Sequence, residues 1–92
     1  MIKTFRHKGL ASFFLEGSKS RILAHHAGRL RILLGALDQA RGPQDMNTPP
    51  WRLHALQGSP VGHWAVWVNG NWRLTFTYDG TDAVLVDYQD HL

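Results

Sequence analysis

The carboxyl-terminal half of the chain alternates apolar and polar residues with a period of two, which is typical of β-strands buried on one face. Segment 72–78 shows this most clearly, with apolar Trp72, Leu74, Phe76 and Tyr78 separated by polar Arg73, Thr75 and Thr77. This segment and three others with a similar pattern predict four strands, at 51–56, 63–68, 72–78 and 83–88. Asn69-Gly70-Asn71 predicts a hairpin between the second and third strands, because Asn-Gly tolerates the positive φ of tight turns.

The amino-terminal half has its apolar residues at helical spacing instead. One helix is predicted over 8–16, with Gly17 placed to stop it. A second is predicted over 22–40, with an apolar stripe formed by Leu23, Ala27, Leu30, Leu34 and Leu37. Residues 2–6 alternate and predict a short opening strand. The order βααββββ predicts a single domain over 1–92 of the α+β class, in which two amino-terminal helices pack on one face of a mostly antiparallel four- to five-stranded sheet.

The amino-acid composition limits the classes of protein to which the chain can belong. The chain has 92 residues, of which 43% are apolar, so it can form one small core and is not disordered. It contains no cysteine, which excludes disulfides, thiolate metal sites and thiol catalysis. The first residues lack an apolar stretch long enough for a secretory signal, and no apolar run is long enough to cross a bilayer. We therefore expect a soluble cytoplasmic protein.

The charge is unevenly distributed along the chain. Residues 1–31 contain seven Lys or Arg residues and one Glu, a balance of +6. Residues 74–92 contain four Asp and no Lys or Arg, a balance of −4. A basic amino-terminal half suits docking along a polyanion, although ordinary solvated helix faces would give the same pattern. Charge alone does not identify the partner.

Short motifs extend over the whole chain, in segments 2–10, 45–47, 51–58, 62–64, 70–76 and 86–90. Two of them are Trp51-Arg-Leu-His-Ala-Leu-Gln-Gly58 and Gly70-Asn-Trp-Arg-Leu-Thr-Phe76. Taken together, the motifs resemble those of the HigB branch of the RelE-type toxins of bacterial toxin–antitoxin modules. The resemblance implies a RelE-like α+β ribonuclease that cleaves messenger RNA on the translating ribosome. It also implies neutralisation by a cognate HigA-type helix-turn-helix antitoxin.

The chain departs from that family at two positions. Gln57 stands where the family commonly has Lys, so the cationic stabilisation of phosphate must come from Arg73 or another residue. The chain ends in His91-Leu92 where the family usually ends in Tyr-His, so His91 occupies the position before the usual terminal imidazole.

These residue types fit cleavage of RNA by its own 2′-hydroxyl without a metal. A base removes the hydroxyl proton, a cation stabilises the phosphorane, and an acid protonates the departing 5′-oxygen. The expected catalytic residues are Arg73 on the phosphate, His54 as base or 2′-hydroxyl contact, His91 as acid or base, Tyr88 to orient the nucleotide and Gln57 as a hydrogen-bonding group. Each has a structural alternative, such as a solvent-facing strand arginine or a core tyrosine.

Contacts with RNA and the ribosome are expected from a second group of residues, namely Arg6, Lys8, Arg29, Arg31, Arg52 and Trp67. The cations would bind phosphates and Trp67 would stack on an exposed base, unless it only packs. No metal or other cofactor is expected, because the histidines do not have the spacing of a metal site and cysteine is absent.

Two further functions remain open from the sequence. One is a non-catalytic inhibitor on the same scaffold, for example a ParE-like inhibitor of DNA gyrase, which the replacement of lysine by Gln57 favours. The other is an inactive homologue that only binds antitoxin, which the presence of both His54 and Arg73 disfavours.

Overall fold

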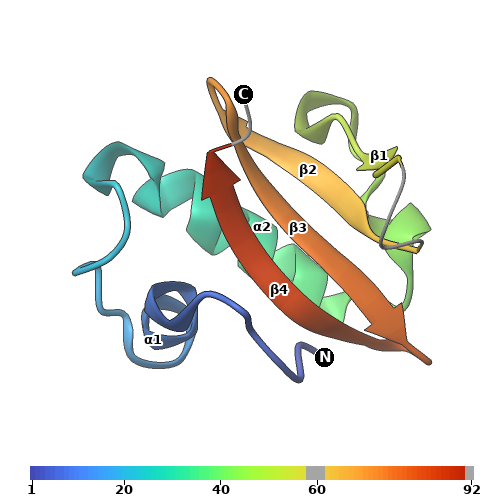
Figure 1. Cartoon of the computed structure of the whole chain (residues 1–92), viewed down its shortest axis with the longest axis horizontal. Coiled ribbons are helices and arrows are strands. Elements are labelled where there is room, and N and C mark those ends of the chain that lie inside the picture. Colours follow the sequence, from blue (N-terminus) through green and yellow to red (C-terminus); the bar gives the residue numbers. More distant parts are fainter. Residues whose placement is uncertain (58–61, 91–92) are drawn as a thin grey trace.

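The sheet is an antiparallel meander whose four strands lie side by side in chain order (Figure 1). It is seen in a computed structural model that describes residues 1–57 and 62–90. The strands are β1 (His54–Ala55), β2 (Trp64–Asn69), β3 (Trp72–Asp79) and β4 (Asp82–Asp90). Gly70, with a φ of 55°, lies in the turn between β2 and β3, as the hairpin motif predicts. Gly80, with a φ of 64°, lies in the turn between β3 and β4.

The first predicted strand of the sheet, 51–56, is much shorter in the structure. Pro49–Trp51 form a 3₁₀ turn, η3, and Arg52 follows it with a left-handed φ of 53°. Because proline restricts φ and donates no backbone hydrogen bond, this segment cannot extend the ladder. Strand pairing is therefore limited to His54 and Ala55, which lie opposite Ala65 and Trp64 of β2.

The strand predicted over 2–6 is wrong, so the observed order is ααββββ. The amino-terminal residues run parallel to β4 but form only two isolated bridges, Ile2 with Ala83 and Phe5 with Val86. Between these bridges Leu85 has a φ of 55°, and its N–H donates to Thr4 Oγ1 instead of to a backbone carbonyl. This bulge interrupts the regular ladder, which explains why an alternating sequence does not form a strand here.

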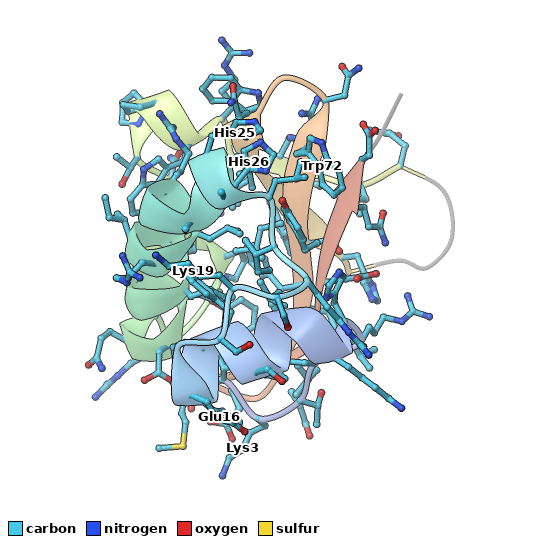
Figure 2. The ribbon with its side chains drawn as sticks, turned by 90° about the vertical axis from the view of Figure 1, so that its left-hand side faces the viewer. Lys3, Glu16, Lys19, His25, His26 and Trp72 are labelled. Atoms are coloured by element: carbon cyan, nitrogen blue, oxygen red, sulfur yellow. The ribbon has the colours of Figure 1, made fainter. Side chains whose placement is uncertain are left out.

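The two predicted helices are present, and both lie on the same face of the sheet (Figures 1 and 2). Helix α1 (Lys8–Glu16) has the predicted bounds, with His7 Nδ1 accepting from Leu10 N–H at its start and Gly17 as a left-handed cap. Helix α2 (Ala27–Gln39) begins later than predicted, because Ala24–His26 form a 3₁₀ turn, η1. The α+β class and the one-sided packing of the helices are confirmed.

The core lies between these helices and the sheet. From the helices it takes Leu10, Phe13, Leu30, Leu33, Leu34 and Leu37, and from the sheet Val66, Val68, Leu74, Phe76, Val86 and Tyr88. Most of these side chains are fully buried, so removal of their apolar area from water fixes α2 against β2, β3 and β4. No helix among the described residues is both long and apolar enough to span a bilayer.

Candidate active site

Strand register brings several predicted residues to the face of the sheet opposite the helices. Directly paired residues of antiparallel strands point to the same side. One row of paired residues consists of His54, Ala65, Thr75 and Asp87, and the next row of Trp67, Arg73 and Gln89. Neither row contributes to the core cluster formed with the helices. We call the surface that carries His54, Trp67, Arg73, Asp87 and Gln89 the site face.

His54 and Arg73 are therefore neighbours on the site face, separated by one strand and one row. From ordinary strand spacing their backbones lie roughly 12 Å apart. This separation allows a long guanidinium and an imidazole to reach the same nucleotide from two sides.

The imidazole of His54 is exposed and held in one tautomer. Its Nδ1 lies 3.0 Å from the carbonyl oxygen of Arg52. A carbonyl can only accept, so Nδ1 donates, and in the neutral ring Nε2 is then left as an acceptor. The left-handed backbone at Arg52 turns this carbonyl toward the ring. An oriented imidazole with a free Nε2 can take a proton from a hydroxyl group.

Arg73 lies half-buried on β3, between Trp67 of β2 and Gln89 of β4. Its Nη1 is buried and has no hydrogen-bond partner among residues 1–57 and 62–90. Within those ranges the one ion pair joins the Met1 amino group to Asp82 at 3.8 Å, so no described carboxylate neutralises Arg73. A guanidinium N–H that has no partner within the protein can donate to a phosphate oxygen.

Asp87 and Gln89 are site-face residues that sequence reasoning missed. The Asp87 carboxylate accepts from its neighbour Tyr88 N–H at 2.9 Å and from Gln89 Nε2 at 2.6 Å. The carboxylate is thus held by the Gln89 amide and not by Arg73. The alternation within the last strand could have placed both residues on the site face, because they alternate with the apolar Val86 and Tyr88.

A cluster of cations surrounds Trp67 at the edge of the site face. The guanidinium carbons of Arg52 and Arg29 lie 4.5 and 5.0 Å from the centroid of the Trp67 ring. The indole N–H donates to the carbonyl of Gly70 at 2.9 Å, which fixes the ring beside the hairpin. The structure thereby unites three residues predicted to contact RNA, and we call them the basic edge.

The other predicted RNA-binding cations lie elsewhere. Arg31 of α2 lies over the ring of Phe13 in α1, 5.5 Å from its centroid, on the helix side of the molecule. Arg6 and Lys8 are exposed, and the backbone N–H of Arg6 donates to Val86 of β4, at the opposite edge of the sheet from β1. These three cations do not join the basic edge.

Tyr88 is not brought together with His54 and Arg73. It lies opposite Leu74 on the helix-facing side of the sheet, where it is 4% exposed. Its hydroxyl is hydrogen-bonded to His26 Nδ1 and its ring is stacked on Trp72. Gln57 is exposed and follows β1 closely in sequence. His91 lies outside the described residues.

Comparison with known proteins agrees with the motifs. Residues 3–91 match the family described as the RelE-like toxin HigB of type II toxin–antitoxin systems. The chain is also a homologue of a protein named Endoribonuclease HigB from Proteus vulgaris, with 37% identity over 91 residues, which cover 99% of each chain. The resemblance drawn from the sequence motifs is confirmed. The chain belongs to the HigB-like family of RelE-like toxins of type II toxin–antitoxin systems.

Proposed function

We propose that this toxin is an endoribonuclease that cleaves messenger RNA on the ribosome by metal-independent attack of the 2′-hydroxyl. The observation that carries the proposal is the strand register, in which His54 and Arg73 share the site face. The name of the Proteus vulgaris homologue supports the same reaction class. A chain of 92 residues is too small to hold a messenger in place by itself, so the ribosome supplies the placement of the substrate.

In the proposed reaction His54 Nε2 removes the proton of the 2′-hydroxyl. The freed oxygen attacks the adjacent phosphorus, and the bond from phosphorus to the 5′-oxygen of the next nucleotide breaks. An acid protonates that oxygen, so the products are a 2′,3′-cyclic phosphate and a 5′-hydroxyl. His91 is our proposal for the acid. A positioned acid or base of this kind typically contributes about 10²–10⁴-fold to the rate.

Arg73 supplies the cation in this scheme. Negative charge on the phosphate oxygens grows as the phosphorane forms, and a preorganised guanidinium stabilises that charge more than it stabilises the starting diester. Gln57 donates hydrogen bonds but carries no charge, so Arg73 has no help from the lysine usual at that position. We leave Tyr88 out of the catalytic set, because its phenol faces the helices.

Binding to RNA is assigned to the basic edge. Arg29 and Arg52 would neutralise phosphates, and the Trp67 ring between strand and hairpin offers a surface for a base. Arg6, Lys8 and Arg31 would contact ribosomal RNA from other sides of the molecule.

A type II toxin has an antitoxin partner. We assign this role to a HigA-type helix-turn-helix protein that keeps the toxin inactive until it is degraded. Because the substrate is on ribosomes, the toxin acts in the cytoplasm.

The proposal is tested by inducing wild type, Arg73→Ala and Arg41→Ala and mapping the 5′ ends of cellular messengers by primer extension. Arg41 is a matched control, since it is an exposed arginine just after α2 that has no part in the proposed site. We expect new ends within codons for wild type and Arg41→Ala, and a loss of roughly 100-fold or more for Arg73→Ala, the typical effect of removing a group that stabilises transition-state charge.

Other outcomes select other functions. DNA breaks without new RNA ends would support a ParE-like inhibitor of gyrase. Normal growth with wild type, together with binding to the antitoxin, would support an inactive homologue. Equal cleavage by Arg73→Ala and wild type would remove Arg73 from the mechanism.

A further inference from the structure

A buried polar contact joins the start of α2 to the end of β4. His26 is 2% exposed, and its Nδ1 lies 2.5 Å from the hydroxyl of Tyr88. The mechanism proposed above uses neither group. Buried polar side chains are rarely kept in a small core without a partner, and here each is the partner of the other. The contact spans 62 residues of sequence and is the one hydrogen bond between two buried side chains in the described part of the chain.

One further aromatic ring, that of Trp72, packs against both members of this contact. Trp72 is stacked on Tyr88, with centroids 4.5 Å apart and an angle of 29° between the ring planes. The ring of His26 meets Trp72 edge-on at 5.6 Å. Figure 2 shows His26 at the beginning of α2 and Trp72 facing it from the sheet. One imidazole therefore contacts residues of both β3 and β4.

The direction of the hydrogen bond follows from the surroundings. Burial lowers the pKa of His26, and the adjacent His25 lowers it further, which favours the neutral imidazole. Burial raises the pKa of Tyr88, against a smaller opposing effect of a hydrogen bond from the Leu23 backbone. Among the described residues, His26 Nδ1 is the one side-chain hydrogen-bond partner of the Tyr88 hydroxyl, so the Tyr88 O–H donates to Nδ1 of the neutral imidazole. The other titratable groups facing this pair are His25, 4.3 Å from His26, and His7, 5.5 Å from Tyr88.

The two aromatic residues held by His26 directly precede two site-face residues. Trp72 comes before Arg73 on β3, and Tyr88 comes before Gln89 on β4. Arg73 and Gln89 are paired in the register. Adjacent residues of a strand point to opposite faces of the sheet. The packing of Trp72 and Tyr88 on the helix side therefore fixes the backbone positions from which the Arg73 and Gln89 side chains project on the site face.

We propose that His26 is a positioning residue for Arg73, which it places by accepting the Tyr88 hydroxyl and packing edge-on against Trp72. This inference rests on the proposed ribonuclease function. Transition-state stabilisation by a guanidinium is sensitive to small displacements, so loss of this contact slows cleavage without removing any group that touches RNA.

Three substitutions separate the hydrogen bond from the packing. Tyr88→Phe keeps the ring on Trp72 but removes the hydroxyl. His26→Leu removes the acceptor, whereas His26→Asn offers a neutral amide oxygen close to the position of Nδ1. Tyr78→Phe is the matched control, because the buried Tyr78 hydroxyl on the same sheet has no hydrogen-bond partner among the described residues.

The readouts are the single-turnover cleavage rate on programmed ribosomes at saturating toxin, the ribosome Kd, and the Tm from circular dichroism. We expect Tyr88→Phe and His26→Leu to cleave about 10- to 100-fold more slowly, the size of effect that a small misplacement produces. Their ribosome Kd should be unchanged at a temperature well below each Tm. His26→Asn should recover most of the rate, and Tyr78→Phe should cleave like wild type.

Two results would overturn the positioning role. One is wild-type cleavage by Tyr88→Phe. The other is a rate for His26→Asn no higher than that of His26→Leu. If wild type itself does not cleave, the proposed function fails, and the Nε–Hε resonance of Arg73 in ¹⁵N spectra decides the positioning role instead. A shift of that resonance in Tyr88→Phe but not in Tyr78→Phe supports it, and an unshifted resonance refutes it.

Discussion

At the scale of single residues, the site depends on groups whose hydrogen-bonding capacity is left partly unused. Nδ1 of His54 is hydrogen-bonded to the Arg52 carbonyl, and Nε2 of the same ring is left to accept a proton. Arg73 keeps a buried N–H without a partner in the described residues. In a folded chain such a group normally costs free energy, so its presence here is consistent with a site that is completed by an RNA phosphate.

The burial of His26 leads to a prediction about how the free energy of unfolding depends on pH. Burial holds its pKa below the ordinary 6.5, so below about pH 6.5 the unfolded chain binds a proton that the folded chain does not. The free energy of unfolding should therefore fall as the pH drops below about 6.5 toward the folded-state pKa. Urea unfolding from pH 7.5 to pH 5, compared between wild type and His26→Asn, measures this. The variant should have the shallower slope, and identical slopes would contradict the assignment.

At the scale of elements, the β2–β3 hairpin sets the pairing of Trp67 with Arg73. Its turn needs the positive φ of 55° at Gly70, where a Cβ would meet no atom within 4 Å. Since there is no steric contact, the effect of a side chain at Gly70 is purely conformational.

Gly70→Ala should therefore lower the free energy of unfolding by about 1–2 kcal/mol, the cost of a left-handed residue with a Cβ. Gly35→Ala is the matched control, because Gly35 lies in α2 and is equally free of neighbours. This control should gain roughly 0.5–1 kcal/mol, since alanine favours helix. Urea denaturation checks both values, and equal changes of the same sign would disagree with this account of the turn.

The elements also show how far sequence reasoning reaches. Helix α1 has the predicted bounds because its spacing and Gly17 act locally. The strand over 2–6 fails because the bulge at Leu85 lies on a distant partner strand and has no signal in residues 2–6. Within the site, alternation alone could show that Arg73 faces away from the core. The proximity of Arg29 to Arg52 and Trp67 could not be predicted in this way, because it depends on how α2 packs against a distant part of the chain.

At the scale of the whole molecule, cations of the described residues are largely without carboxylate partners. In the ranges that the structure describes, only the Met1 amino group forms an ion pair. Along the sequence, four of the seven acidic residues lie within 79–90, whereas seven of the ten Lys and Arg residues lie within 1–31. This separation favours long-range attraction to a polyanion that approaches from the helices and the basic edge.

Ribosome binding should consequently weaken as salt rises, with part of the dependence due to the basic edge. In plots of log Kd against log salt, Arg29→Ala and Arg52→Ala should each reduce the slope by about 0.7–0.9, the value for one lost phosphate contact. Arg41→Ala should leave the slope unchanged. Filter binding to purified ribosomes over a range of KCl concentrations gives these slopes, and unaltered slopes in both variants would exclude phosphate contacts at the basic edge.

The hairpin has one more consequence, since it carries an indole on each side of the sheet. Trp67 lies beside two guanidiniums on the edge of the site face, whereas Trp72 is stacked on Tyr88 in the core. The fluorescence of the first responds to a nucleobase and that of the second to loosening of the interior. Two variants can be made, each of which keeps one of these two indoles and has the other three tryptophans replaced by phenylalanine. The emission spectrum of the variant with Trp67 would follow substrate engagement, and that of the variant with Trp72 would follow unfolding.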